Sequence, residues 1–226
     1  MPPGGELGGA PIDRYLPEYD VAITEHLVID APRARTYQEA RNLDFMTVRS
    51  PLLTTSFFVR ELPARLRCHR GQQTEPPPEL RLATGGTGLP GWLTLGEVPG
   101  QEIAFGAVGR FWSAEIEWRD VPLNEFAGFD EPGWGKIACH FLVRPAGERR
   151  SVLSYECRTA TTDDEARRRM ARYWWLIRPF AGHVLCATLR TVAGRAVAGR
   201  APRAASGHAL TEGGSTRFRR TEGVAS

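Results

Sequence analysis

The chain has 226 residues, 42% of them hydrophobic and 24% charged, a composition typical of one globular domain with a terminal extension. No apolar run approaches the roughly 20 residues of a membrane-spanning helix, and the first residues lack the basic start and apolar core of a secretory signal. The net charge of +3 does not indicate a nucleic-acid surface, because residues 195–226 carry six arginines against two glutamates and the remainder is near −1. We therefore predict a cytoplasmic protein without a membrane span and without a nucleic-acid partner.

The first elements are predicted from turn residues and alternation. Residues 1–19 are rich in Gly and Pro and are expected to form a flexible leader. Residues 21–29 alternate along the chain and include several β-branched side chains, which predicts a strand. Asp30 then offers an N-cap and Pro32 suits a first helical turn, so a short helix should follow.

The next segment is expected to hold one more helix and a long loop. Ser50 and Pro51 repeat the helix-start signal, and the apolar residues after them predict a second short helix that Pro63 ends or bends. Residues 68–91 are polar and rich in Pro and Gly, which is typical of a long connecting loop.

Strand-like segments fill the middle of the chain. Alternation, and turn residues between the segments, predict antiparallel strands at residues 92–97, 102–108, 111–118, 136–144 and 151–159. The last two form the clearest hairpin.

The two faces of this hairpin differ in chemistry, because successive strand residues point to opposite sides. One face is apolar and includes Phe141 and Tyr155, whereas the other includes His140, Glu156 and Arg158. The charged face is either an ordinary solvated surface with cross-strand pairs, or it surrounds the polar end of a ligand. In the second interpretation His140 acts as a general base that Glu156 orients.

The strongest helix signal lies near the C-terminus. Thr162 and Glu165 form a capping box in which Thr162 is the N-cap. Apolar residues then recur with a 3.6-residue period over residues 166–192, and Pro179 is expected to kink the helix. Residues 198–226 lack periodicity and are expected to be a disordered basic tail.

The order of elements predicts an α+β domain at residues 20–197. A curved antiparallel sheet of about six to seven strands should wrap around the long C-terminal helix, with the two short helices after the first strand. Two short helices cannot cover a whole sheet, so the long helix must lie against it. Where sheet and helix diverge, we expect a cavity.

Four stretches of sequence carry a resemblance to a known family. They are Glu25-His26 with Ile29-Asp30-Ala31-Pro32, GAVGRFW at 106–112, YECRT at 155–159 and YWWLIRP at 173–179. On these the chain resembles the SRPBCC or START-like superfamily, and in particular its bacterial members. This is the helix-grip fold of polyketide cyclases and plant pollen-allergen-type binding proteins. The resemblance implies a helix-grip fold and a ligand cavity, and it leaves carrier, hydratase and cyclase roles open.

Candidate cavity residues are large apolar side chains on the predicted strands and on the long helix. They are Trp112, Trp118, Phe141, Tyr155, Met170, Tyr173, Trp174 and Ile177. Each could equally be ordinary core packing. The possible polar anchors are Arg110, Glu115, His140, Glu156 and Arg158.

The cysteines and histidines do not indicate a metal site or a bound cofactor. Cys68, Cys139, Cys157 and Cys186 have no metal-ligand spacing, and we predict reduced core thiols. Cys139 and Cys157 could face each other across two strands. No phosphate loop or nucleophile motif is present, so we predict no metal and no cofactor.

Three functional hypotheses remain. The first is the binding of a hydrophobic or amphipathic small molecule, such as a lipid, an isoprenoid or an aromatic polyketide-like compound, between sheet and helix. The second is a cyclase or dehydratase that uses His140, Glu156 and Arg110 for acid-base chemistry inside the same cavity. The third is an interaction module without a ligand, which predicts a filled cavity and an exposed apolar patch elsewhere. The sequence does not decide the oligomeric state.

Overall fold

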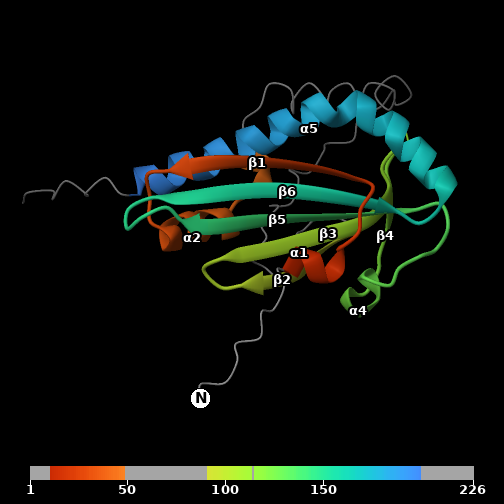
Figure 1. The fold of residues 1–226 in the computed structure, drawn as a ribbon, viewed down its shortest axis with the longest axis horizontal. Coiled ribbons are helices and arrows are strands. Elements are labelled where there is room, and N and C mark those ends of the chain that lie inside the picture. Colours follow the sequence, from red (N-terminus) through yellow and green to blue (C-terminus); the bar gives the residue numbers. More distant parts are fainter. Residues whose placement is uncertain (1–10, 49–90, 114, 200–226) are drawn as a thin grey trace, which may run out of the picture.

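The computed structural model describes residues 11–48, 91–113 and 115–199 and shows a helix-grip α+β fold (Figure 1). Its six-stranded antiparallel sheet has the order β1-β6-β5-β3-β2, with β4 paired to β3. The strands are β1 Val21–Ile29, β2 Trp92–Val98, β3 Glu102–Arg110, β4 Glu117–Arg119, β5 Gly135–Pro145 and β6 Ser151–Thr161. The helices are α1 Pro11–Tyr15, α2 Arg33–Arg41, the 3-10 turn η1 Phe45–Thr47, α4 Leu123–Phe126 and α5 Asp164–Ala198. The predicted fold class and the predicted hairpin are confirmed.

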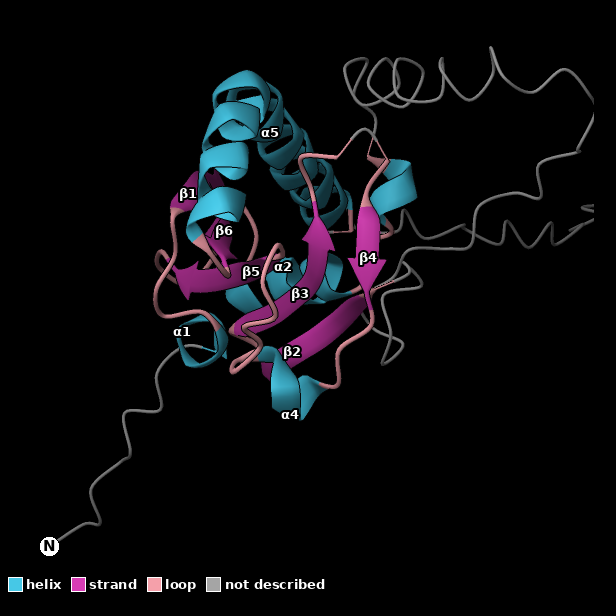
Figure 2. Ribbon diagram, turned by 90° about the vertical axis from the view of Figure 1, so that its right-hand side faces the viewer, coloured by secondary structure: helices cyan, strands magenta, loops and turns pink. Residues whose placement is uncertain are grey.

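The inner face of the sheet is the face that α2 and α5 cover. Alternation along β5 and β6 places Phe141 and Tyr155 on this face, directly opposite each other in the register. The core there also includes Leu185, Leu189 and Val192 from α5. Figure 2 shows α5 lying over β1 and β6, with β2 and β4 towards the opposite edge of the sheet.

The outer face of the sheet is buried as well. Its apolar layer joins α1, α4 and the outward-pointing residues of the strands: Ile12, Leu16, Leu95, Ala104, Val108, Phe126, Trp134 and Ala138. Gly106 makes the close approach of α4 possible, since a Cβ there would lie 3.0 Å from the Phe126 ring. The sheet therefore has a packed layer on each side.

The leader prediction is wrong for residues 11–19. Helix α1 lies within that range, and Ile12 and Leu16 are 0% and 2% exposed. A helix of five residues has too little periodicity to stand out in a sequence, and the Gly and Pro residues around it suggested a loop.

The long helix is confirmed, but its cap is not the predicted one. Asp163 is the N-cap, and its carboxylate accepts the backbone N–H of Ala166 at 2.8 Å. The Thr162 hydroxyl instead accepts the N–H of Trp134 at 3.0 Å, because this residue still belongs to the extended chain leaving β6. Pro179 lies inside the helix, which arches over the sheet in Figure 1. No helix among the described residues is long and apolar enough to cross a bilayer.

Two further boundaries differ from the predictions. Pro32, not Asp30, is the N-cap of α2. The strand predicted at 111–118 is confined to β4, since the chain turns after β3 and the N–H of Ser113 bonds to the carbonyl of Arg110. The predicted second helix, the long loop and the basic tail lie outside the described residues.

Candidate functional site

An aromatic band crosses the inner face of the sheet, and we take it as the candidate site. It consists of Phe45 from η1, Trp92 from β2, Phe105 from β3, Trp118 from β4, Phe141 from β5 and Tyr155 from β6. The band exists because the strands place aromatic residues at inward-pointing positions of neighbouring strands. Consecutive rings lie in contact, at centroid distances from 4.4 Å for Phe141 and Tyr155 to 5.9 Å for Trp92 and Trp118.

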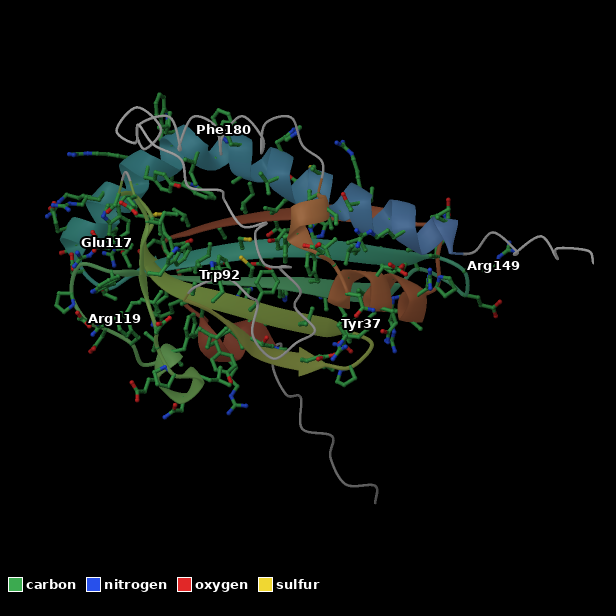
Figure 3. The ribbon with its side chains drawn as sticks, turned by 180° about the vertical axis from the view of Figure 1, so that it is seen from behind. Tyr37, Trp92, Glu117, Arg119, Arg149 and Phe180 are labelled. Atoms are coloured by element: carbon green, nitrogen blue, oxygen red, sulfur yellow. The ribbon has the colours of Figure 1, made fainter. Side chains whose placement is uncertain are left out.

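Burial changes along this band. Phe105, Phe141 and Tyr155 are 3%, 0% and 6% exposed and form its floor, whereas Trp92 and Trp118 are only half-buried. Figure 3 shows Trp92 on the sheet. The half-buried rings offer aromatic faces that the described side chains do not fully cover.

The floor of the band carries three weakly polar groups. The Sγ atoms of Cys139 and Cys157 lie 2.7 Å apart, as expected for residues directly opposite each other in β5 and β6. Burial raises the pKa of the Tyr155 hydroxyl well above its ordinary value, and the neighbouring Cys157 and Cys139 add to this. Burial likewise raises the pKa of the Cys139 thiol. The Tyr155 hydroxyl and the Cys139 thiol therefore stay protonated near neutral pH and can donate hydrogen bonds.

One hydroxyl on the inner face lacks a partner. Thr94 lies opposite Phe105 in the β2–β3 register, so its side chain points to the same face. Its Oγ1 atom is buried and makes no hydrogen bond among the described residues. Such an atom is a position where the polar group of a ligand could bind.

Helix α5 supplies the other candidate residues. Met170 is buried, and Tyr173, Trp174 and Ile177 are half-buried. This burial pattern is compatible with side chains that only pack in the core and with side chains that line a cavity. The neighbouring Trp175 is 83% exposed, so the helix presents distinct sides over this stretch.

The predicted residues at the end of β3 are divided between two places. Trp118 belongs to the aromatic band, and Trp112 packs edge-on against Phe111 at 6.5 Å. Arg110 alternates with the outward-pointing Val108, bonds to Glu117 at 2.9 Å and stacks over Trp134. Its prediction as a polar anchor of the cavity is therefore wrong. Glu115 is exposed.

The predicted anchors His140, Glu156 and Arg158 also lie on the outer face, away from α5. Strand alternation separates them from Phe141 and Tyr155. Their prediction as cavity anchors is therefore wrong. The alternative interpretation, that the charged face of the hairpin is an ordinary solvated surface, is also wrong at His140. This side chain is only 4% exposed and lies beneath the outer layer.

These residues form a buried charge network. His140 Nδ1 lies 2.7 Å from Glu102 Oε1, and its Nε2 lies 3.3 Å from Glu156 Oε2. Arg158 then joins Glu156 to Asp13 of α1, with 2.6 Å in both ion pairs. Glu102 is 0% exposed, and its Oε1 also accepts the Ile12 N–H at 3.4 Å.

The network connects α1 to the sheet through Asp13 and the Ile12 N–H. Burial opposes the charge of Arg158, but its hydrogen bonds to Glu156 and Asp13 outweigh this and raise the pKa of the guanidinium. Both nitrogens of His140 are engaged by carboxylates under α1, so a substrate has no access to them in this arrangement. Sequence reasoning missed Glu102, although a Glu directly before the apolar run 103–109 of strand β3 was a visible signal.

A surface groove lies apart from the aromatic band. It has a volume of about 660 Å³ and runs along the seam between β1 and the region of α5 around Pro179. Its lining includes Glu25, Arg178 and His183. Among the described residues no group of three or more His, Cys, Asp or Glu side chains could hold a metal ion.

Neither the protein-family models nor the curated proteins give a sequence match to this chain. Among solved structures, the NMR structure of a protein from Arthrobacter aurescens is 9% identical, covering 79% of this chain and 87% of its own, with a TM-score of 0.35. A crystal structure from Chromobacterium violaceum is 14% identical, covering 76% and 94%, with a TM-score of 0.31. The Zhui aromatase/cyclase from a Streptomyces species is 14% identical, covering 83% and 98%, with a TM-score of 0.28. At these TM-scores the neighbours add nothing to what the topology itself shows, a helix-grip arrangement of six strands and a long C-terminal helix.

Proposed function

We propose that this protein binds a hydrophobic or amphipathic small molecule, of the lipid, isoprenoid or aromatic polyketide-like class, between the inner face of the sheet and α5. The aromatic band supports this proposal. Its rings pass from a fully buried floor to half-buried tryptophans at β2 and β4. An apolar molecule that covered Trp92 and Trp118 would bury their remaining surface, at about 25 cal/mol for each Å².

The polar groups of the inner face refine the ligand class. Thr94 Oγ1 is buried without a partner, and a buried hydroxyl that makes no hydrogen bond costs about 1–3 kcal/mol. A ligand with one polar group next to a large apolar body would remove this cost. We therefore expect an amphipathic ligand in preference to a pure hydrocarbon.

The cyclase or dehydratase alternative has weaker support. It requires an acid and a base inside the cavity, but His140, Glu156 and Arg110 lie on the outer face. The described groups on the floor of the inner face are Tyr155 and two thiols, and burial raises the pKa of both Tyr155 and Cys139. Such groups can donate hydrogen bonds to a bound ligand but are poor general bases near neutral pH.

Native mass spectrometry tests the binding proposal. The full chain is exposed to a mixed extract of lipids and aromatic metabolites, desalted and sprayed under native conditions, and we expect an adduct of defined mass. Trp92→Ala should weaken the adduct, whereas the control Leu123→Ala removes an exposed apolar side chain of α4 and should leave it unchanged. Thr94→Val should weaken amphipathic ligands more than pure hydrocarbons. Recovery of bare protein only, or equal adducts from Trp92→Ala and wild type, would refute the proposal.

A further inference from the structure

A contiguous apolar patch lies on the outward side of α5. It consists of Trp175, Leu176 and Phe180, which are 83%, 61% and 47% exposed. Leu176 and Phe180 are one helical turn apart, and Trp175 adjoins them. Figure 3 shows Phe180 on the helix. Single exposed apolar residues are common, but three large ones together mark a surface that contacts something apolar.

The charges that α5 itself places around this patch have one sign. From Ala166 to Ala198 helix α5 contains no Asp or Glu, while Arg172 and Arg178 flank the patch. The three preceding arginines of the helix are paired with carboxylates, as in the 2.9 Å bond of Arg167 to Asp20. Within the described part of the chain, Arg172 and Arg178 make no ion pair. The patch is therefore apolar at its centre and cationic at its rim.

We propose that this side of α5 docks on the surface of a bilayer that contains anionic phospholipids. A helix with Trp, Leu and Phe on one side and unpaired arginines beside them can lie in the interfacial plane, with the apolar side chains among the acyl chains and the guanidinium groups at the phosphates. The charges and the Pro within the helix fit a position on the bilayer and not across it. This inference does not depend on the proposed ligand.

The other possible occupants fit the charges less well. A second copy of this chain, packed about a two-fold axis, would bring the same arginines against each other. A nucleic acid would satisfy Arg172 and Arg178 but would place three apolar side chains against a phosphate backbone. An anionic bilayer matches both the charge and the apolar centre.

Vesicle co-sedimentation of the full chain tests the proposal. The vesicles are either phosphatidylcholine alone or phosphatidylcholine with phosphatidylglycerol, at low and at physiological salt. We expect binding to the anionic vesicles only, weakened by salt. Arg172→Ala and Arg178→Ala should each lower the partition constant about fivefold. The combined variant Trp175→Ala, Leu176→Ala and Phe180→Ala should lower it by more than about tenfold.

Matched controls separate this surface from other cationic or apolar positions. Arg149→Ala removes an exposed arginine at the β5–β6 turn, far from Phe180 in Figure 3, and Val197→Ala removes an exposed apolar residue near the end of α5. Neither should change binding. Because the patch is exposed, all variants should keep the circular dichroism spectrum of the wild type.

A second readout reports insertion directly. Brominated acyl chains quench tryptophan that enters the bilayer, so the emission of wild-type protein should fall and that of Trp175→Phe should fall much less. The proposal is overturned by absence of binding to anionic vesicles, or by equal binding of the patch variant and the controls. A patch-dependent dimer in sedimentation velocity would overturn it as well, since the patch would then be an interface between copies.

Discussion

Replacing His140 by Leu should destabilise the fold by about 1–3 kcal/mol, the usual cost of leaving a buried polar group without its hydrogen-bond partner. The imidazole lies 2.7 Å from Glu102 and 3.3 Å from Glu156. Glu102 is 0% exposed and its Oε2 has no partner among the described residues, so there the variant leaves this carboxyl group with only the Ile12 N–H at 3.4 Å. For a chain of this length about 1 kcal/mol corresponds to roughly 2–4 °C, so Tm should fall by roughly 2–12 °C.

Urea denaturation followed by circular dichroism measures this loss, and His26→Leu is the matched control. His26 also lies on the sheet and bonds to Ser154 at 2.7 Å, but it is exposed, so its replacement should cost about 1 kcal/mol or less. The double variant Glu102→Gln with His140→Leu should recover part of the loss, because a neutral amide costs less to bury without a partner than an ionisable carboxyl group does. Equal losses in His140→Leu and His26→Leu, or no recovery in the double variant, would refute the buried network.

Three further outcomes are expected from the geometry. Hydrogen bonds from two backbone N–H groups lower the pKa of Asp163, so its contribution to stability is present above the unfolded-state pKa and is lost as pH falls through the folded-state value. The Tm of Asp163→Ala should accordingly lie below that of the wild type at neutral pH and approach it in acid, and a constant gap would contradict this. Directly opposed strand residues have the Cα spacing of a disulfide, so treatment with a small-molecule disulfide should join Cys139 to Cys157 and lower the mass by two hydrogen atoms. Replacement of Cys157 by Ser should abolish this change, and a persistent mass loss would assign it elsewhere. A Cβ at Gly106 would lie 2.6 Å from a backbone carbonyl, so Gly106→Val should cost about 1–3 kcal/mol in urea denaturation. The control Gly128→Val, where the space is open, should cost less, and equal costs would argue against the close packing of α4 on the sheet.

Strand alternation and helix periodicity made most of the fold predictable. Alternation sorted the hairpin residues correctly, with Phe141 and Tyr155 on one face and His140 and Glu156 on the other. It could not say whether the charged face meets solvent, because that depends on a helix brought from far away in the chain. Helix α1 is that element, and its five residues are too few for a periodic signal.

The candidate site was only partly predictable for a related reason. Phe141, Tyr155 and Trp118 were expected at the cavity and do belong to the aromatic band. Trp92 and Phe105 were not singled out, although both are aromatic residues on strands that had been predicted. Their juxtaposition follows from the β2–β3 register, which a single sequence does not specify.

The buried charge network also limits which substitutions this sequence can accept during evolution. Its members come from α1, β3, β5 and β6, so the loss of any one leaves a charge in another element without its partner. Neutral change there would require paired substitutions, whereas the half-exposed rings around Trp92 can be exchanged one at a time. Substitutions at the half-buried Trp92 and Trp118 should therefore disturb the fold less than substitutions within the network.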